Sequence, residues 1–105
     1  MTEFFVVLTT CPDESTAARI ARELVESRLA ACVTRQPVHS TYTWQGRIND
    51  EPEVLLIIKT LASRFAELEK RLQSLHPYDV PEIIALPVAA GSAAYLAWLS
   101  AEAIP

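Results

Sequence analysis

The chain has 105 residues, of which 50% are hydrophobic and 21% are charged, and its formal net charge is −4. This length fits a single domain, residues 1–105. The mean hydropathy of +0.18 indicates more apolar surface than a small monomer can hide, so we expect an oligomer. The acidic balance excludes nucleic acid and an anionic membrane as partners, because both attract Lys and Arg.

The beginning of the chain and its cysteines indicate the compartment. Glu3 stands where a signal peptide is positive, and the apolar run of "MTEFFVVLTT" is too short for a secretory core or a membrane span. Cys11 and Cys32 are too few for a disulfide framework, and they form no CxxC motif. We therefore expect a cytoplasmic protein with two thiols.

A strand and a helix are predicted at the start. The run at residues 4–10 is rich in β-branched and aromatic residues, which is typical of a buried strand. Three-and-four spacing of apolar residues predicts an amphipathic helix over residues 14–28, capped by Asp13. Its apolar side consists of Ala17, Ile20, Ala21, Leu24 and Val25.

A hairpin is predicted next. "LAACV" leads into a second strand, and residues 38–44 alternate as strand residues do. Gln45-Gly46 forms a plausible two-residue turn, because Gly tolerates positive φ. The return strand starts at Arg47, is interrupted by the polar "NDEPE" and resumes over residues 54–60. Either a bulge or bent hairpin, or a separate short loop, accounts for this interruption.

A second amphipathic helix follows and ends before Pro77, because the residue before a proline is disfavoured in a helix. Glu67 and Arg71 are spaced for an ion pair on its surface. The apolar positions of this helix are Leu61, Phe65, Leu68, Leu72 and Leu75.

The last predicted elements are a strand and a short helix. "EIIALPV", residues 82–88, lies between Pro81 and Pro87, which favours an edge strand. Gly91-Ser92 then begins a helix. The apolar side of that helix is formed by Tyr95, Leu96, Trp98 and Leu99.

The order β-α-β-β-α-β-α predicts an α+β fold, a ferredoxin-like βαββαβ sandwich with an extra C-terminal helix. One antiparallel sheet would carry two helices on one face. The other face is apolar too, because "FFVVL" and "VLLIIK" are hydrophobic at nearly every position. We expect a second copy of the sheet to cover it.

Two groups of residues are candidates for chemistry. Cys11, Cys32 and His76 would form a soft-metal set where the fold brings them together, and the alternative is that both thiols are small core residues. In "HPYDVPEI", residues 76–83, two prolines stiffen a segment rich in polar side chains. The segment is either a stiff connector or a binding site.

Known catalytic and nucleic-acid patterns are absent. The sequence has no Gly-x-Ser-x-Gly elbow and no Gly-rich phosphate loop, and it contains two glycines in all. An RNA-recognition module has the same element order, but its aromatic strand signature is missing from "VLLIIKT". The sequence therefore favours a binding protein over an enzyme.

Five segments together resemble the CutA divalent-cation tolerance proteins over nearly the whole chain: "TTCPDESTAARIARELVESRLAACV", "YTWQGRI", "EVLLIIKT", "HPYDVPEIIALPV" and "YLAWL". The resemblance implies a ferredoxin-like homotrimer, similar in assembly to the PII signal proteins, with the hairpin around "YTWQGRI" reaching a neighbouring subunit. It also implies a response to divalent metal ions, copper above all, with no obligatory cofactor.

The family pattern also suggests site residues. Its proposed copper ligands are a strand cysteine and two adjacent histidines, and these positions hold Thr9, Leu75 and His76 here, so that Cys11 would have to replace the missing thiol. The positions that the family keeps, and that would line an intersubunit cleft, are Trp44, Lys59, His76, Tyr78 and Glu82.

Three functions follow as hypotheses. The first is a trimeric protein that binds a divalent metal such as Cu(II), or a small ligand, in clefts where Lys59 and Glu82 pair. The second is a PII-like sensor of small molecules or a protein-interaction scaffold. The third, less favoured, is an enzyme with an intersubunit site, using Glu82 or His76 as general base and Lys59 to stabilise an anion.

Overall fold

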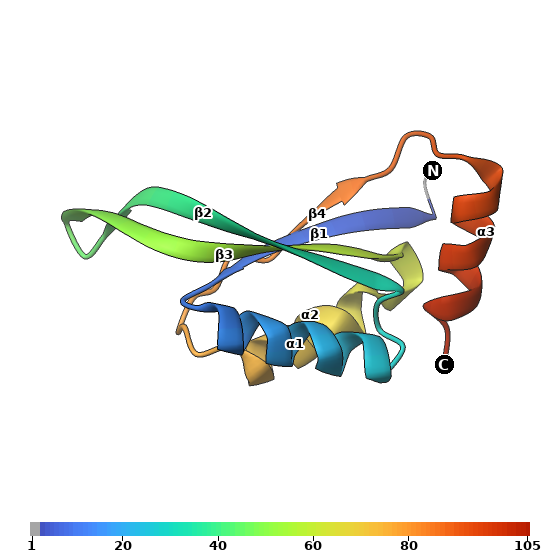
Figure 1. Ribbon diagram of the computed structural model, residues 1–105, viewed down its shortest axis with the longest axis horizontal. Coiled ribbons are helices and arrows are strands. Elements are labelled where there is room, and N and C mark those ends of the chain that lie inside the picture. Colours follow the sequence, from blue (N-terminus) through green and yellow to red (C-terminus); the bar gives the residue numbers. More distant parts are fainter. Residues whose placement is uncertain (1–2) are drawn as a thin grey trace.

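Four strands and three helices follow one another in the predicted order in a computed structural model that describes residues 3–105 (Figure 1). Residues 1 and 2 of the predicted domain lie outside the described part. The elements are β1 Phe4–Cys11, α1 Glu14–Glu26, β2 Cys32–Trp44, β3 Arg47–Leu61, the 3-10 turn Ala62–Arg64, α2 Phe65–Leu75, β4 Ile84–Pro87 and α3 Ala93–Glu102.

The strands form one antiparallel sheet in the order β2-β3-β1-β4. Helices α1 and α2 lie together under one face, and α3 stands at one end of the sheet (Figure 1). This arrangement confirms the predicted ferredoxin-like class. Because alternate residues of a strand point to opposite faces, Val7 and its neighbour Ile58 face the helices, while Val6 and Lys59 face the open side.

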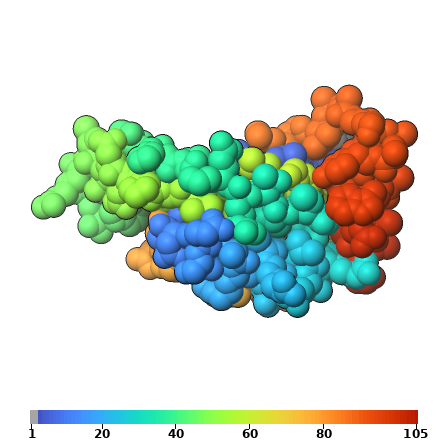
Figure 2. Space-filling model, viewed as in Figure 1, coloured from blue at the N-terminus to red at the C-terminus, as the bar shows by residue number. Residues whose placement is uncertain are grey.

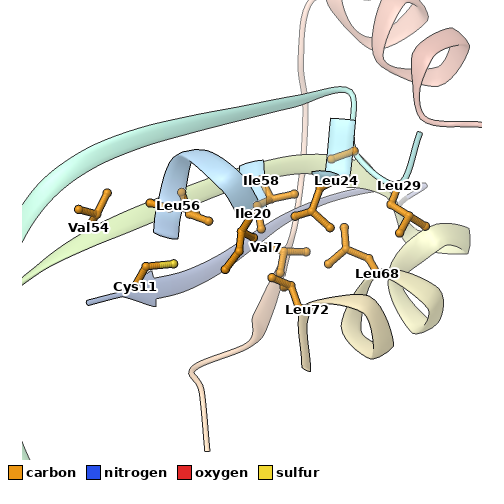
Figure 3. Packing of buried hydrophobic residues seen from close by; sticks show 12 residues of the cluster. Val7, Cys11, Ile20, Leu24, Leu29, Val54, Leu56, Ile58, Leu68 and Leu72 are labelled. Atoms are coloured by element: carbon orange, nitrogen blue, oxygen red, sulfur yellow. The ribbon is translucent and has the colours of Figure 1, made fainter. Parts of the chain in front are cut away.

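The main core lies between the sheet and the first two helices. Val7 and Ile58 from the sheet, Leu24 from α1 and Leu68 from α2 are fully buried, and Figure 3 shows their side chains pointing toward one another. Burying each such side chain contributes about 1.5–3 kcal/mol relative to exposure. Packing against the sheet therefore stabilises both helices, and the same packing holds the strands in place.

The prediction for α1 needs two corrections. The helix ends at Glu26 rather than at residue 28, where Arg28 has a positive φ of 60°. Val25 is 42% exposed, although it shares the apolar spacing. The predicted cap is confirmed, because the Asp13 carboxylate accepts a 2.8 Å hydrogen bond from the Thr16 amide.

The hairpin is one continuous pair of strands, so the predicted interruption at "NDEPE" is wrong. The register runs without a break from Cys32 beside Lys59 to Trp44 beside Arg47. Before Val54, residues 47–53 of β3 have β2 as their single neighbour in the described chain, so a proline whose nitrogen faces the free side costs no ladder hydrogen bond. The predicted turn is confirmed, with φ of 53° at Gln45 and 78° at Gly46.

The distal half of the hairpin forms a projecting arm. Past the end of β1, its two strands extend away from the rest of the molecule, as the green arm in Figure 2 shows. The molecule is accordingly elongated, measuring 44 × 26 × 22 Å along its principal axes. Within the described chain this arm pairs with no third strand, so it offers side chains on both of its faces.

The later elements are also shifted from their predicted bounds. Leu61 ends β3 instead of starting a helix, and α2 begins at residue 65 and ends before Pro77 as expected. The predicted Glu67–Arg71 pair does not form. Arg71 instead lies 3.6 Å from Glu23 of α1, and Glu67 lies 3.4 Å from Arg64. The Arg71 pair joins the two helices.

The C-terminal part confirms an edge strand and corrects the last helix. β4 is shorter than predicted, and within the described residues it pairs with β1 alone. Ser92 caps α3, accepting a hydrogen bond from the Tyr95 amide. Leu99 is buried, whereas Tyr95 and Trp98 are 41% and 43% exposed, so these two do not belong to the buried side of the helix.

Candidate functional site

The segment after α2 is tied to the end of β1 by the His76 ring. Its Nε2 lies 2.8 Å from the carbonyl oxygen of Thr10, and its Nδ1 accepts a 3.1 Å hydrogen bond from the Tyr78 amide. His76 also follows Leu75 as the residue that ends the helix, and its backbone N–H bonds to Leu72. These contacts fix the course of the chain through Pro77.

The two hydrogen bonds define the protonation state of His76. A carbonyl oxygen only accepts and an amide N–H only donates, so a neutral ring with its proton on Nε2 satisfies both. Burial lowers the pKa of His76 below 6.5, although the Thr10 carbonyl and Glu53 act in the opposite direction. Both ring nitrogens are therefore engaged inside the chain.

Tyr78 connects the segment to the hairpin. Its phenol donates a 2.6 Å hydrogen bond to Oε2 of Glu53, a residue of β3 that is 8% exposed. Burial raises the pKa of Tyr78 well above its usual value, and the hydrogen bond to Glu53 raises it further. The phenol therefore keeps its proton. The Tyr78 ring also lies against the His76 ring, with centroids 4.8 Å apart.

A groove of about 670 Å³ lies between the hairpin arm and the segment after α2. The structure brings together three of the predicted cleft residues there, Trp44, Tyr78 and Glu82. Pro77, Asp79 and Val80 belong to the candidate segment at residues 76–83, and prediction from sequence missed the lining residues of β1 and of the hairpin other than Trp44. The complete lining is Thr10, Ser40, Thr41, Tyr42, Trp44, Glu53, Pro77, Tyr78, Asp79, Val80 and Glu82.

The signal for two of the missed residues was present in the sequence. Ser40, Tyr42 and Trp44 alternate along β2 and share a face, and Glu53 lies on that same face of β3 opposite Val38. Placing "NDEPE" outside the strand hid Glu53. Had the hairpin been predicted as continuous, Tyr42 and Glu53 would have been placed on one face as candidate site residues.

Lys59 is absent from the groove within one subunit. Its ammonium group hydrogen-bonds the Thr34 hydroxyl at 2.5 Å and lies 3.8 Å from Sγ of Cys32. These residues lie on the open face of the sheet, toward the end that α3 occupies. The predicted pairing of Lys59 with Glu82 does not occur within the described chain.

The predicted soft-metal set is also dispersed. Cys11 is fully buried in the main core, where burial raises its pKa to about 11, so the alternative of a core thiol holds for Cys11, whereas Cys32 is only partly buried. Cys32 lies on the opposite face, since it pairs with Lys59 while Cys11 pairs with Val54. Among residues 3–105, no three His, Cys, Asp or Glu side chains are grouped so that they could hold a metal ion.

The open face of the sheet carries an apolar surface beside the groove. Its residues come from three strands, and those of the edge strand, Ile84 and Leu86, are each 49% exposed. The predicted apolar character of this face is thus confirmed. We call this surface the open-face patch, and it consists of Val6, Leu8, Leu55, Ile57, Ile84 and Leu86.

Within the described part of the chain, no helix is long and apolar enough to cross a membrane.

Fold and surface together define a class, the ferredoxin-like sandwich subunit whose sheet has one bare apolar face and a long hairpin arm. Comparison with known proteins names the family. The model of the CutA1 divalent ion tolerance proteins matches residues 5–102, and the chain belongs to that family.

Individual relatives agree over most of the chain. The divalent-cation tolerance protein CutA of Thermus thermophilus is 52% identical over 95 residues, which cover 90% of this chain and 92% of the relative. Human protein CutA is 50% identical over 91 residues, and the match spans 86% of this chain and 51% of that protein. The crystal structure of CutA from Xylella fastidiosa superposes with a TM-score of 0.95 at 44% identity, covering 98% of this chain and all of that one.

Proposed function

We propose that this protein acts in tolerance of divalent metal ions, as a cytoplasmic homotrimer that binds a ligand in clefts between its subunits. Membership of the CutA1 family supports the first part, as do relatives from two bacteria that are named for divalent-cation tolerance. Two free thiols suit a reducing compartment. The observation that carries the proposal is the open-face patch next to an acidic, aromatic groove.

The patch supports assembly. Ile84 and Leu86 are half exposed on an edge strand, and covering a side chain of this kind completely contributes about 1.5–3 kcal/mol relative to full exposure. An exposed edge strand with apolar neighbours also invites pairing with another chain. A closed ring of three subunits covers each copy of the patch and leaves none unpaired, as in the assembly of the PII signal proteins.

The dispersion of the predicted residues supports a cleft between subunits. Lys59 and Cys32 lie on the open face at one end of the sheet, whereas Glu82 lines the groove beside the hairpin arm. A site that contains both Lys59 and Glu82 therefore needs two subunits. Such a site would sense a small ligand, which is the PII-like form of the proposal.

A copper site within one subunit does not fit the described residues. Cys11 is buried with a raised pKa, and both nitrogens of His76 are hydrogen-bonded. A thiol binds copper as the thiolate, and imidazole binds through a free nitrogen lone pair. The proposal therefore places a divalent ion such as Cu(II) between subunits, with donors that one chain does not assemble.

The other hypotheses have less support. An intersubunit enzyme with His76 as general base is disfavoured, because both ring nitrogens of His76 are engaged in hydrogen bonds within the chain. The form with Glu82 as general base has no observation of its own behind it. A scaffold for other proteins would use the hairpin arm, whose Ile48 is 76% exposed. We retain it as the alternative to a ligand-binding trimer.

The proposal is tested by mass and by metal titration. Light scattering should give three times the subunit mass of 11.6 kDa. Calorimetric titration of the trimer with Cu(II), Zn(II) and Cd(II) should give saturable binding of at least one ion, and that binding should survive His76→Gln. A monomer mass overturns the assembly, and no saturable binding of any ion removes the metal from the proposal.

A further inference from the structure

Glu53 is a buried carboxylate without a cation. Its side chain lines the groove at 8% exposure, and its hydrogen bond comes from the neutral phenol of Tyr78. No Lys, Arg or His side chain of residues 3–105 forms an ion pair with it. Buried carboxylates are normally paired with a cation, because removing the charge from water is costly. The missing partner points to a cation that comes from outside the subunit.

The other residues that line the groove also favour a cation. Asp79 and Glu82 add two more carboxyl groups to the lining, which includes no Lys, Arg or His. Tyr42 and Trp44 line the groove and are 39% and 46% exposed within one subunit, so their rings form part of the surface that a ligand in the groove would contact. Carboxylates beside aromatic faces recognise ammonium and guanidinium groups, through charge-assisted hydrogen bonds and cation–π contacts.

We propose that this groove binds a small organic cation, a primary ammonium or guanidinium group on a short apolar body. The charged head is held by the carboxylates, Glu53 first among them, and the apolar body lies against Trp44 and Tyr78. The inference rests on the small-ligand form of the proposed function, and it names the chemical class of that ligand. A volume of about 670 Å³ is in the range of small-molecule pockets, roughly 300–1,000 Å³.

Other cations fit the groove less well. A divalent metal ion needs several donors in one group, and the described residues contain no such cluster. Lys59 of a second copy is a possible source of an ammonium group. Its ammonium keeps one hydrogen bond to Thr34 within its own subunit, and one lysine side chain fills a small part of the groove. A single lysine also balances only one of the carboxylates of Glu53, Asp79 and Glu82, so the groove retains a preference for a further cation.

The two tryptophans allow a direct test by NMR. Trp44 lines the groove and Trp98 lies on α3, so their indole N–H signals report on two different places in one titration. We expect n-butylammonium and n-butylguanidinium to shift the Trp44 signal saturably and to leave the Trp98 signal in place. Butanol and butyrate, with the same apolar body but without the positive charge, should not do so. A silent Trp44, or an equal response to butanol, overturns the proposal.

Variants connect the response to the carboxylates. Glu53→Gln keeps an acceptor for Tyr78 and should weaken binding of n-butylammonium about tenfold or more, as expected for loss of a hydrogen bond to a charged group. Glu82→Gln should weaken it as well, and it serves as the second variant where thermal melting shows that Glu53→Gln is unfolded. Glu69→Gln removes the same charge from the surface of α2 and should leave the affinity unchanged. Unchanged affinity in both groove variants contradicts the proposal.

One more variant distinguishes a free cationic ligand from the Lys59 side chain of a second copy. Binding that is absent in the wild type and appears in Lys59→Met assigns the groove to the lysine of a second copy, which overturns the proposal. A trimer mass together with a silent Trp44 overturns this inference alone. A monomer mass overturns the proposed assembly, whatever Trp44 shows, so the two failures are distinguishable.

Discussion

Tyr78 and Glu53, which are 25 residues apart in sequence, form a 2.6 Å hydrogen bond that joins the segment after α2 to the hairpin. Glu53 lies at 8% exposure and has no counter-ion among residues 3–105. The phenol is thus the main group that compensates its burial. The groove keeps its shape because this bond connects its two walls.

Removing the Tyr78 hydroxyl should destabilise the protein. Tyr78→Phe leaves Glu53 buried without its donor, and a hydrogen bond to a charged group contributes about 1.5–3 kcal/mol. We expect the free energy of unfolding in urea to fall by about that amount. The comparison needs equal protein concentrations, because the stability of an oligomer depends on concentration.

Tyr42→Phe is the matched control for this variant. Its phenol bonds the exposed Glu51 at 3.1 Å, so water replaces the lost partner, and the cost should be below about 0.5 kcal/mol. Equal losses in the two variants would contradict the special role of the Tyr78–Glu53 bond.

Stability should fall in mild acid because of His76. Burial lowers the pKa of His76 in the folded state, so the unfolded state takes up the proton first. The contribution of the neutral ring is complete above about pH 6.5, the pKa of the unfolded state, and is lost as pH falls below that value through the lower pKa of the folded state. A proton on Nδ1 would also face the Tyr78 amide N–H, where the ring now accepts a hydrogen bond. Urea unfolding at pH 7.5 and at pH 5 measures the difference.

Two histidine variants assign this pH dependence. His76→Gln should reduce the loss of stability between the two pH values, whereas His39→Gln, on the exposed side of β2, should retain it. If the pH dependence disappears in the His39 variant and persists in the His76 variant, it comes from His39, and the role given to His76 is contradicted.

The turn of the hairpin should respond to backbone conformation alone. Gly46 has a φ of 78°, and a Cβ there meets no atom within 4 Å, so the cost of Gly46→Ala is conformational. We expect a loss of about 1 kcal/mol. Gln45, with a φ of 53°, should gain a few tenths of a kcal/mol from replacement by Asn, which tolerates this region better. Thermal unfolding of the two variants should show a loss of stability for Gly46→Ala and a gain for Gln45→Asn. A stabilising Gly46→Ala would contradict the turn geometry.

Assembly should depend on the open-face patch. Leu86→Glu places a charge on an apolar surface of β4, which a subunit interface cannot bury cheaply. We expect the mass in light scattering to fall from trimer to monomer. Val25→Glu, on the outer side of α1 with a similar exposure of 42%, should remain trimeric. Dissociation of the α1 variant alone would place the interface elsewhere.

Local patterns predicted the fold well, because helices and strands leave periodic signals. The spacing of Ala17, Ile20 and Leu24 predicted α1, and Pro77 predicted the end of α2, since both effects act within a few residues. The "NDEPE" segment was misread for a physical reason. Proline and acidic residues are rare in strands in general, but they are tolerated in an arm that has one neighbour.

The site was harder to predict because its contacts join distant segments. His76 bonds the carbonyl of Thr10, which is 66 residues away, so a sequence pattern cannot show that both ring nitrogens are engaged. The same holds for Lys59, whose partner Thr34 comes from another strand. Trp44, Tyr78 and Glu82 were found together because a resemblance, rather than a spacing, connected them.

The central claim is that the assembled trimer, and not the single subunit, provides tolerance of divalent ions. The most direct test is growth in graded Cu(II) of a bacterial strain that lacks its own member of the family. The strain expresses either the wild type or Leu86→Glu, at matched protein levels. We predict that the wild type restores growth and that the monomeric variant does not. Equal restoration by both would contradict the account.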